Sequence, residues 1–172
     1  MKKIDITFLP SIKGNYFDDD LIIDWCKKLN DSFDFINTYI PKNAEEAKIF
    51  LKKSNAAYGA LTKDLIGHCN NVQWLQAPQA APPPDFYYDE LINHPMMVTN
   101  FRGIYNDHIS HHILAMILSF SKSLNLYIHQ QSKRMWRPIT SNIGSTRYLP
   151  EMKIMIIGLG GIGDETARLC NY

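Results

Sequence analysis

The residues best suited to chemistry form one glycine-rich motif, which runs from Gly158 to Gly163 with the spacing G-x-G-x-x-G. The apolar run Ile154–Ile157 precedes this motif, and the helix-compatible run Asp164–Leu169 follows it. A strand, a tight glycine turn and a helix in this order bind the pyrophosphate of dinucleotide coenzymes. We therefore predict a coenzyme-binding turn, formed by Gly158, Gly160, Gly161, Ile162 and Gly163.

Each glycine of this motif has its own reason for lacking a side chain. Gly158 permits the tight turn, Gly160 lets the backbone approach a pyrophosphate, and Gly163 lets the helix pack against the strand. The N–H groups of Gly161 and Ile162 would then point toward the phosphates from the helix N-terminus. A glycine-rich turn without any ligand is the alternative interpretation.

The coenzyme predicted from this motif is NAD or NADP. An acidic residue about 20 residues beyond such a motif binds the ribose hydroxyls and separates the two coenzymes. The sequence extends only to Tyr172, so this position is not among its residues. The choice between NAD and NADP therefore stays open.

Histidines are a second source of possible chemistry. His108, His111 and His112 share one face of a predicted helix, and two histidines four residues apart can ligate a metal. The sequence has no H-E-x-x-H motif, so we favour a polar helix start at a domain or subunit contact and expect no metal site. The remaining histidines are expected at the surface or in turns: His68, His94 and His129.

Three charged features have a structural and a functional interpretation. Arg102 follows a predicted strand, where it could bind an anion or, as we favour, form a structural ion pair. Asp18–Asp20 could suggest a cation site, but acidic residues also stabilise a helix start, which we favour. A basic cluster beside Trp136 is interpreted as a solvated helix end, with a homodimer contact as the alternative. Its members are Lys133, Arg134 and Arg137.

The composition excludes several classes of protein. The 172 residues allow one domain, or one and part of a second, and the net charge of +1 argues against a nucleic-acid partner. The longest apolar run, Ile113–Leu118, is too short to span a membrane, and we see no signal peptide. The odd number of cysteines, none in a C-x-x-C pair, argues against a disulfide framework and favours a cytoplasmic setting. They are Cys26, Cys69 and Cys170.

The elements that must position these residues alternate between strand and helix patterns, which indicates an α/β fold with a parallel sheet. Strands are predicted at 3–9, 33–39, 56–60, 72–76 and 96–100, with a sixth at 153–157. Helices are predicted from 18–20, from Asn43 with Glu46 in a capping box, from Thr62 as N-cap, around 88–93, and from Ile162 onward. The four prolines of the loop 77–85 exclude regular structure there.

One long helix is predicted to start at Asn106 or Asp107 and to continue through Tyr127. Its buried stripe is expected to consist of Ile109, Ile113, Met116, Ile117, Phe120 and Leu124. The domain boundary is placed near Arg102, which divides the chain into 1–101 and 102–172. The strand 153–157 has no predicted neighbour, so residues 150–172 are expected to be poorly ordered or prone to association unless this strand pairs with another copy.

Several stretches together resemble the D-isomer-specific 2-hydroxyacid dehydrogenases. They are Val72–Gln76, Val98–Ile104, His112–Ala115 and Leu149–Lys153, the last of which leads into the glycine motif. The resemblance covers residues 56–172. The T-N-x-R-G strand end, the long helix and its spacing to the glycine motif are its more specific features.

This resemblance implies a flavodoxin-like substrate domain in residues 1–101 and the incomplete start of a Rossmann-like NAD(P)-binding domain in residues 102–172. It also implies reduction of 2-keto acids, such as glyoxylate or hydroxypyruvate, to D-2-hydroxy acids in the cleft between the two domains. Members are usually homodimers, and the helix from Asp107 would belong to that interface.

The sequence departs from the family in two ways. The family's catalytic arginine, glutamate and histidine lie beyond the glycine motif, so no residue here matches them, and this chain alone is expected to be inactive. The family's carboxylate-binding loop corresponds to the segment around Ala80 and Ala81, where Pro82–Pro84 remove backbone N–H donors. One alternative is a non-catalytic homologue that acts as a binding or dimerisation module. Another is an unrelated flavodoxin-like protein that binds flavin or phosphate beyond the fourth and fifth strands.

Overall fold

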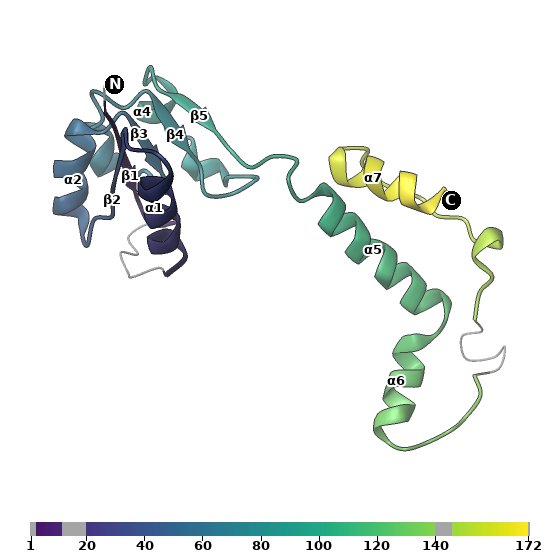
Figure 1. The fold of residues 1–172 in the computed structure, drawn as a ribbon. Helices are drawn as coiled ribbons and strands as arrows, with labels where there is room; N and C mark the ends of the chain where they lie inside the picture. The colour runs from purple at the N-terminus through teal and green to yellow at the C-terminus, as the bar shows by residue number, and fades with distance from the viewer. Residues whose placement is uncertain (1–2, 12–19, 140–145, 172) are drawn as a thin grey trace. The chain divides into compact units, whose positions relative to one another are not determined.

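A computed structural model describes residues 3–11, 20–139 and 146–171 of the chain. These residues form two compact units, Met1–Arg102 and Gly103–Tyr172, which are described separately below (Figure 1). Asp18 and Asp19 of the acidic run lie outside the described residues.

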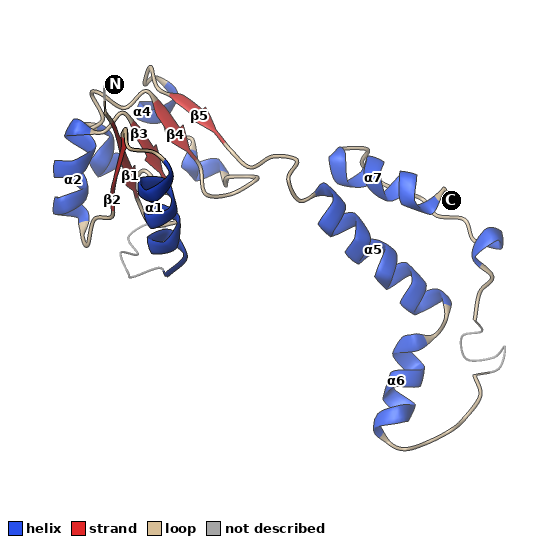
Figure 2. Cartoon of the chain, in the orientation of Figure 1, coloured by secondary structure: helices blue, strands red, loops and turns tan. Residues whose placement is uncertain are grey.

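The first unit is built on a five-stranded parallel sheet with the order β2-β1-β3-β4-β5 (Figure 2). Ile6 of β1 lies opposite Ala56 of β3, and Gln76 of β4 lies opposite Thr99 of β5. This is the flavodoxin-like strand order, so the predicted fold class is confirmed. The strands are β1 (Ile4–Phe8), β2 (Ile36–Tyr39), β3 (Ala56–Tyr58), β4 (Trp74–Gln76) and β5 (Met97–Thr99).

Helices cover both faces of this sheet, because strand residues alternate between two separate apolar clusters. Phe8 packs with Ile22 and Cys26 of α1 (Asp20–Ser32). Ala57 and Leu75 belong to the larger cluster. That cluster also contains residues of α2 (Ala44–Lys53), α3 (Lys63–Ile66) and α4 (Asp89–Ile92).

The helix starts predicted in this unit are present, but only one is capped as expected. The Asn43 side chain accepts a hydrogen bond from the Glu46 N–H at 2.9 Å, and the Glu46 carboxylate accepts one from the Lys42 N–H at 2.9 Å. Thr62 precedes α3 but makes no cap bond, because its hydroxyl donates to the Asp64 carboxylate instead. The proline-rich loop also holds one short 3-10 turn, η1 (Pro84–Phe86), which the sequence did not predict.

The second unit contains α5 (Asn106–Ser121), α6 (Leu124–Ser132), the 3-10 turn η2 (Leu149–Glu151) and α7 (Gly161–Cys170). The prediction of one continuous helix through Tyr127 is wrong. The helix breaks at Ser123, whose φ of 55° is left-handed and cannot continue an α-helix. No helix in the described part of the chain is long and apolar enough to cross a membrane.

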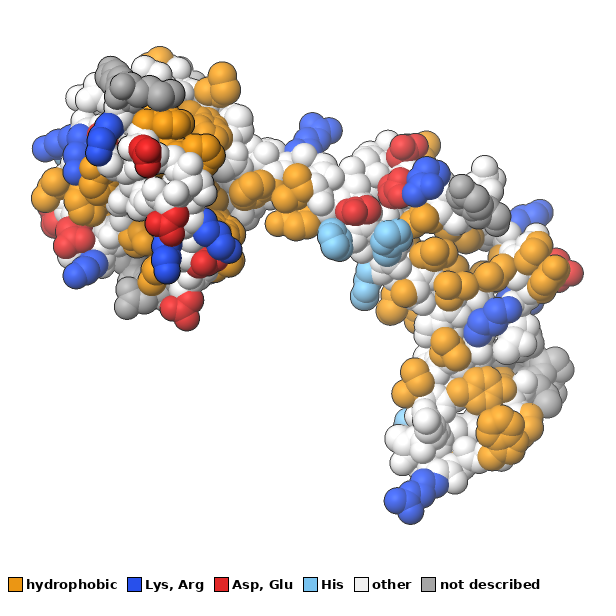
Figure 3. All heavy atoms as spheres, viewed as in Figure 1, with side chains coloured by type: hydrophobic (Ala, Val, Ile, Leu, Met, Phe, Trp, Pro, Cys, Tyr) orange, Lys and Arg blue, Asp and Glu red, His pale blue; other side chains and the backbone are white. Residues whose placement is uncertain are grey.

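The predicted buried stripe of the long helix is wrong for four of its six residues, and the other two, Ile113 and Ile117, are half-buried. Ser110 and Ser121 are the buried side chains of α5, whereas Phe120 is 64% exposed. The reason is that α7 packs against the face of α5 on which Asn106 meets Gly161, and Ser110 lies one turn further along that face. The exposed members of the stripe are Ile109, Met116, Phe120 and Leu124, and Figure 3 shows apolar side chains along this part of the surface.

The sixth strand predicted at 153–157 is absent from the described residues, because nothing there pairs with it. Met155 and Ile157 are 86% and 93% exposed. Ile154 and Ile156 instead line an apolar pocket within the second unit. A segment with apolar residues on both sides is typical of a strand buried inside a parallel sheet.

Candidate functional site

The glycine motif forms a tight turn that leads directly into α7. Gly158 has a φ of +97°, a left-handed conformation that side chains rarely adopt. Gly160 is the N-cap residue, and its carbonyl accepts the first helical hydrogen bond from the Asp164 N–H at 2.9 Å. The N–H groups of Gly161, Ile162 and Gly163 therefore have no acceptor within the helix and are available to an anion.

Two glycines of this turn differ sharply in the space around them. A Cβ atom added to Gly163 would lie 2.0 Å from the carbonyl oxygen of Gly158, so this glycine lets the helix pack on the turn. A Cβ atom added to Gly160 would meet nothing within 4 Å. The turn is therefore closed at Gly163 and open at Gly160, where a ligand could reach the backbone. The role predicted for Gly160 toward a pyrophosphate stays a prediction.

The other side of the turn faces α5. A Cβ atom added to Gly161 would lie 2.3 Å from the side-chain nitrogen of Asn106, and Figure 1 shows α5 and α7 side by side with their N-termini at the same end. A pocket of about 440 Å³ lies here, and its lining is acidic. Its residues are Gly103, Ile104, Asn106, Asp107, Gly161, Asp164 and Glu165. An anion would be repelled from this side and would favour the open side at Gly160.

The charge of Glu165 is partly offset on α7 itself. A hydrogen bond from Arg168 lowers the pKa of the Glu165 carboxyl below its ordinary value, and the nearby charges of Arg168 and His111 act in the same direction. The Arg168 guanidinium binds both carboxylate oxygens, with its Nε 2.9 Å from Oε2. Glu165 is therefore an ionised partner of Arg168 rather than a proton donor.

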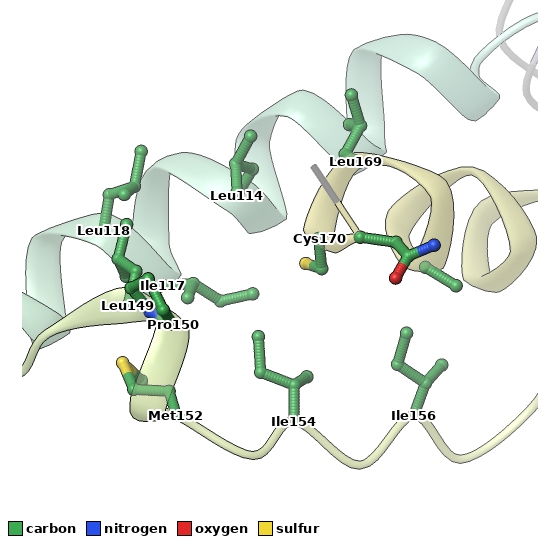
Figure 4. A pocket seen from close by; sticks show the side chains of 12 residues that line it. Leu114, Ile117, Leu118, Leu149, Pro150, Met152, Ile154, Ile156, Leu169 and Cys170 are labelled. Atoms are coloured by element: carbon green, nitrogen blue, oxygen red, sulfur yellow. The ribbon is translucent and has the colours of Figure 1, made fainter.

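A second pocket of this unit is lined mainly by apolar side chains and has a volume of about 430 Å³. In Figure 4 the side chains of Ile154 and Ile156 point across this space toward α5 and α7. Leu114 and Leu118 of α5 and Leu169 of α7 face it from the other side. Its lining suits further apolar chain rather than a charged ligand.

In the first unit, the candidate substrate loop begins at the carboxyl end of β4. The Ala77 N–H donates to the Thr99 carbonyl at 2.8 Å, which brings the start of the loop beside the end of β5. Ala80 is half-buried and Ala81 is exposed, and both precede the three consecutive prolines. Ala80 and Ala81 therefore follow the carboxyl end of β4, and ligands of parallel sheets bind outside the carboxyl ends of strands.

A polar chain near this edge was missed by the sequence analysis. The Trp74 indole N–H donates to the Thr99 hydroxyl at 2.7 Å, and that hydroxyl donates to the Gln76 side chain at 2.6 Å. Gln76 and Thr99 lie opposite each other on neighbouring strands but 23 positions apart in the chain, so no local pattern indicates this hydrogen bond. Arg102, expected to form an ion pair, makes none with the residues that the structure describes.

The remaining candidates form no common site in the part of the chain that the structure describes. His108, His111 and His112 are exposed, and no group of three potential metal ligands occurs among the described residues. Trp136 is 88% exposed and lines a pocket of about 620 Å³ beside α6. The basic residues next to it are exposed as well: Lys133, Arg134 and Arg137.

Comparison by sequence finds no relative, since no protein-family model and no curated protein matches the chain. Comparison by structure gives matches that cover nearly all of this chain. A D-isomer specific 2-hydroxyacid dehydrogenase family protein from Aeromonas salmonicida matches with a TM-score of 0.72 and 21% identity, over 99% of this chain and 51% of that one. A protein of the same description from Klebsiella pneumoniae matches with a TM-score of 0.69 and 19% identity, over 99% and 49%.

A third match is the D-lactate dehydrogenase from Aquifex aeolicus, solved with NAD and lactic acid, with a TM-score of 0.62 and 16% identity over 97% and 48% of the two chains. The chain has the fold of the N-terminal portion of a D-2-hydroxyacid dehydrogenase. It spans about half the length of these solved structures. The fold that the sequence resemblance implied is therefore confirmed.

Proposed function

We propose that this chain is the N-terminal portion of an NAD(P)-dependent D-2-hydroxyacid dehydrogenase. Residues 1–101 would form the substrate domain and residues 102–172 the start of the coenzyme domain. The observation that carries the proposal is the glycine turn at α7, closed by Gly163 on one side and open at Gly160 on the other. The structural match of nearly the whole chain to about half of such a dehydrogenase supports it.

The coenzyme phosphates would lie on the open side of the turn. The N–H groups of Gly161 and Ile162 would donate to the pyrophosphate, and the positive end of the α7 dipole would favour its charge. When bound, NADH or NADPH would supply the hydride that reduces the keto carbon. The residues of this chain would bind and orient the coenzyme, and none of them matches the family's proton donor.

The substrate would be a 2-keto acid or 2-hydroxy acid, with glyoxylate and hydroxypyruvate as the first candidates. Its carboxylate would meet the loop around Ala80 and Ala81, where backbone N–H groups precede the prolines. We also propose that the protein acts in the cytoplasm. The three cysteines are free thiols in the structure, as is usual for proteins of a reducing compartment.

The test is a titration of the ¹⁵N-labelled chain with NADH, observed by two-dimensional NMR. We expect the amide signals of Gly158–Gly163 to shift in a saturable way, with no NADH oxidation when glyoxylate or hydroxypyruvate is added. Inorganic sulfate at the same ionic strength is the control for general anion effects. Unchanged signals in the glycine turn would refute coenzyme binding, and protein-dependent turnover would refute the expected inactivity.

A second candidate function, a dimerisation module, is favoured by the exposed apolar stripe of α5. Ile109, Met116 and Phe120 are separated by seven and four residues and are 40%, 47% and 64% exposed. We expect a homodimer in light scattering, because burying these side chains removes apolar surface from water. Phe120→Glu would give a monomer in that case. A monomeric wild-type chain at high concentration would exclude this interface.

A further inference from the structure

One side chain of α5, that of Asn106, lies close against the start of α7. We infer that Asn106 is a positioning residue, which fixes the first turn of α7 and thereby the N–H groups of Gly161 and Ile162. Its proposed benefit for a bound pyrophosphate rests on the proposed function. The contact itself does not depend on that function.

The contact between Asn106 and Gly161 is so close that a side chain at position 161 would force the Asn106 carboxamide to move. A Cβ atom at Gly161 would lie 2.3 Å from Nδ2, 2.9 Å from Cγ and 3.0 Å from Oδ1 of Asn106. The whole carboxamide therefore lies against the backbone of Gly161, and any larger residue there would displace it. The glycine at position 161, which the G-x-G-x-x-G pattern does not require, leaves the Asn106 carboxamide in this place.

The backbone of Asn106 is held in place by its own helix. The Ser110 hydroxyl donates to the Asn106 carbonyl at 2.7 Å and to the Asp107 carbonyl at 2.9 Å. The Ser110 side chain is fully buried, so these hydrogen bonds are shielded from water. Asn106 is therefore presented to α7 from a rigid first turn of α5.

The first turn of α7 is thus fixed on two sides within three residues. Asn106 contacts it at Gly161, and the Gly158 carbonyl contacts it at Gly163. Removing the Asn106 side chain would take away the contact at Gly161 and leave the one at Gly163. The phosphate-facing N–H groups between these two points would then lose the fixed direction on which anion binding depends.

The neutrality of Asn106 matters as well, because its neighbours in the same pocket are acidic. Asp107, Asp164 and Glu165 already place negative charge near the two helix N-termini. A carboxamide fills the space beside Gly161 without adding to that charge. Asn106→Asp would keep the shape, stabilise the helix start, and compete with a bound anion for the same N–H groups.

The decisive test is a double-mutant cycle with Asn106→Ala and Gly161→Ala, read by amide hydrogen exchange of Asp164. We expect Gly161→Ala alone to speed this exchange at least tenfold, and the double variant to restore most of the protection, because the new methyl group occupies the space of the lost carboxamide. Gly67→Ala is the matched control, since a Cβ atom there would meet nothing within 4 Å. Additive effects of the two substitutions would overturn the inference.

A second measurement separates positioning from packing. We expect Asn106→Asp to protect the Asp164 amide as well as the wild type does but to weaken NADH binding about tenfold or more. Equal affinity for NADH in both proteins would overturn the link to the phosphate. If the wild type binds no NADH, the proposed function and that link fail together, while the exchange cycle still decides whether Asn106 fixes α7.

Discussion

The geometry of the glycine turn predicts different effects for two substitutions, Gly163→Ala and Gly160→Ala. Gly163→Ala would place a methyl group 2.0 Å from the Gly158 carbonyl oxygen, although carbon atoms in contact prefer separations of about 3.5 Å. The obstacle is backbone, so no side-chain rotation relieves it, and α7 must move by roughly 1 Å or more. Overpacking of this kind costs about 1–3 kcal/mol, and we expect the loss in the packing of α7.

Gly160→Ala should leave the folded protein almost unchanged. Its φ of −77° and ψ of −176° are accessible to alanine, and the added methyl group meets no atom within 4 Å. The lower entropy of the unfolded chain would stabilise the protein by about 0.4–1 kcal/mol. Alanine is a poorer N-cap than glycine by a similar amount, so the two effects should nearly cancel.

The assay compares stability and ligand binding in both variants. Urea denaturation and amide exchange in α7 should show a loss for Gly163→Ala and no clear change for Gly160→Ala. In the NMR titration with NADH, Gly160→Ala should lose the shifts in the glycine turn although it is folded, because its methyl group projects into the open side. Wild-type NADH binding by Gly160→Ala, or wild-type stability of Gly163→Ala, would refute this reasoning about the turn.

Three further predictions concern the first unit. Asn43→Ala should destabilise it by about 1 kcal/mol in urea denaturation, because the N-cap bond of α2 is lost, while Asn43→Asp should retain stability. Leu75→Ala, at a fully buried position of β4, should cost about 2–5 kcal/mol, whereas Met97→Ala on the exposed side should cost far less; equal losses would contradict the assigned core. Burial raises the pKa of the Cys69 thiol to about 12, so its contribution to stability is complete below pH 9 and is lost as the pH rises from 9 toward 12. Urea titrations of Cys69→Ala and the wild type between pH 8 and 11 should converge, and parallel curves would contradict this burial effect.

Local signals predicted most of the first unit because its elements are specified by nearby residues. The period-two alternation of β1 and the Asn43–Glu46 spacing each lie within a few residues of the structure that they specify. The ends of the strands were less accurate, since pairing partners decide where a ladder stops. Residues 72–76 were predicted as a strand, for example, but β4 begins at Trp74.

The second unit was harder to predict because its burial depends on distant neighbours. A left-handed serine at position 123 has no sequence signal, so the break between α5 and α6 was missed. The apolar stripe of α5 was detected, but the helix turns Ser110 rather than Ile109 toward α7. The contact of Asn106 with Gly161 joins positions that are far apart in the chain, which no local pattern reveals.

The strand order of the first unit also bears on how the protein is made. Every strand of the β2-β1-β3-β4-β5 sheet lies between Ile4 and Thr99, so among the described residues the sheet needs no strand that follows Thr99. Because domains are synthesised from the N-terminus and generally fold as units, this sheet can close while the ribosome is still translating the glycine turn. The apolar segment 152–157 then leaves the ribosomal tunnel after the first unit has folded. The strands of that unit are already paired, so they can no longer mispair with this segment.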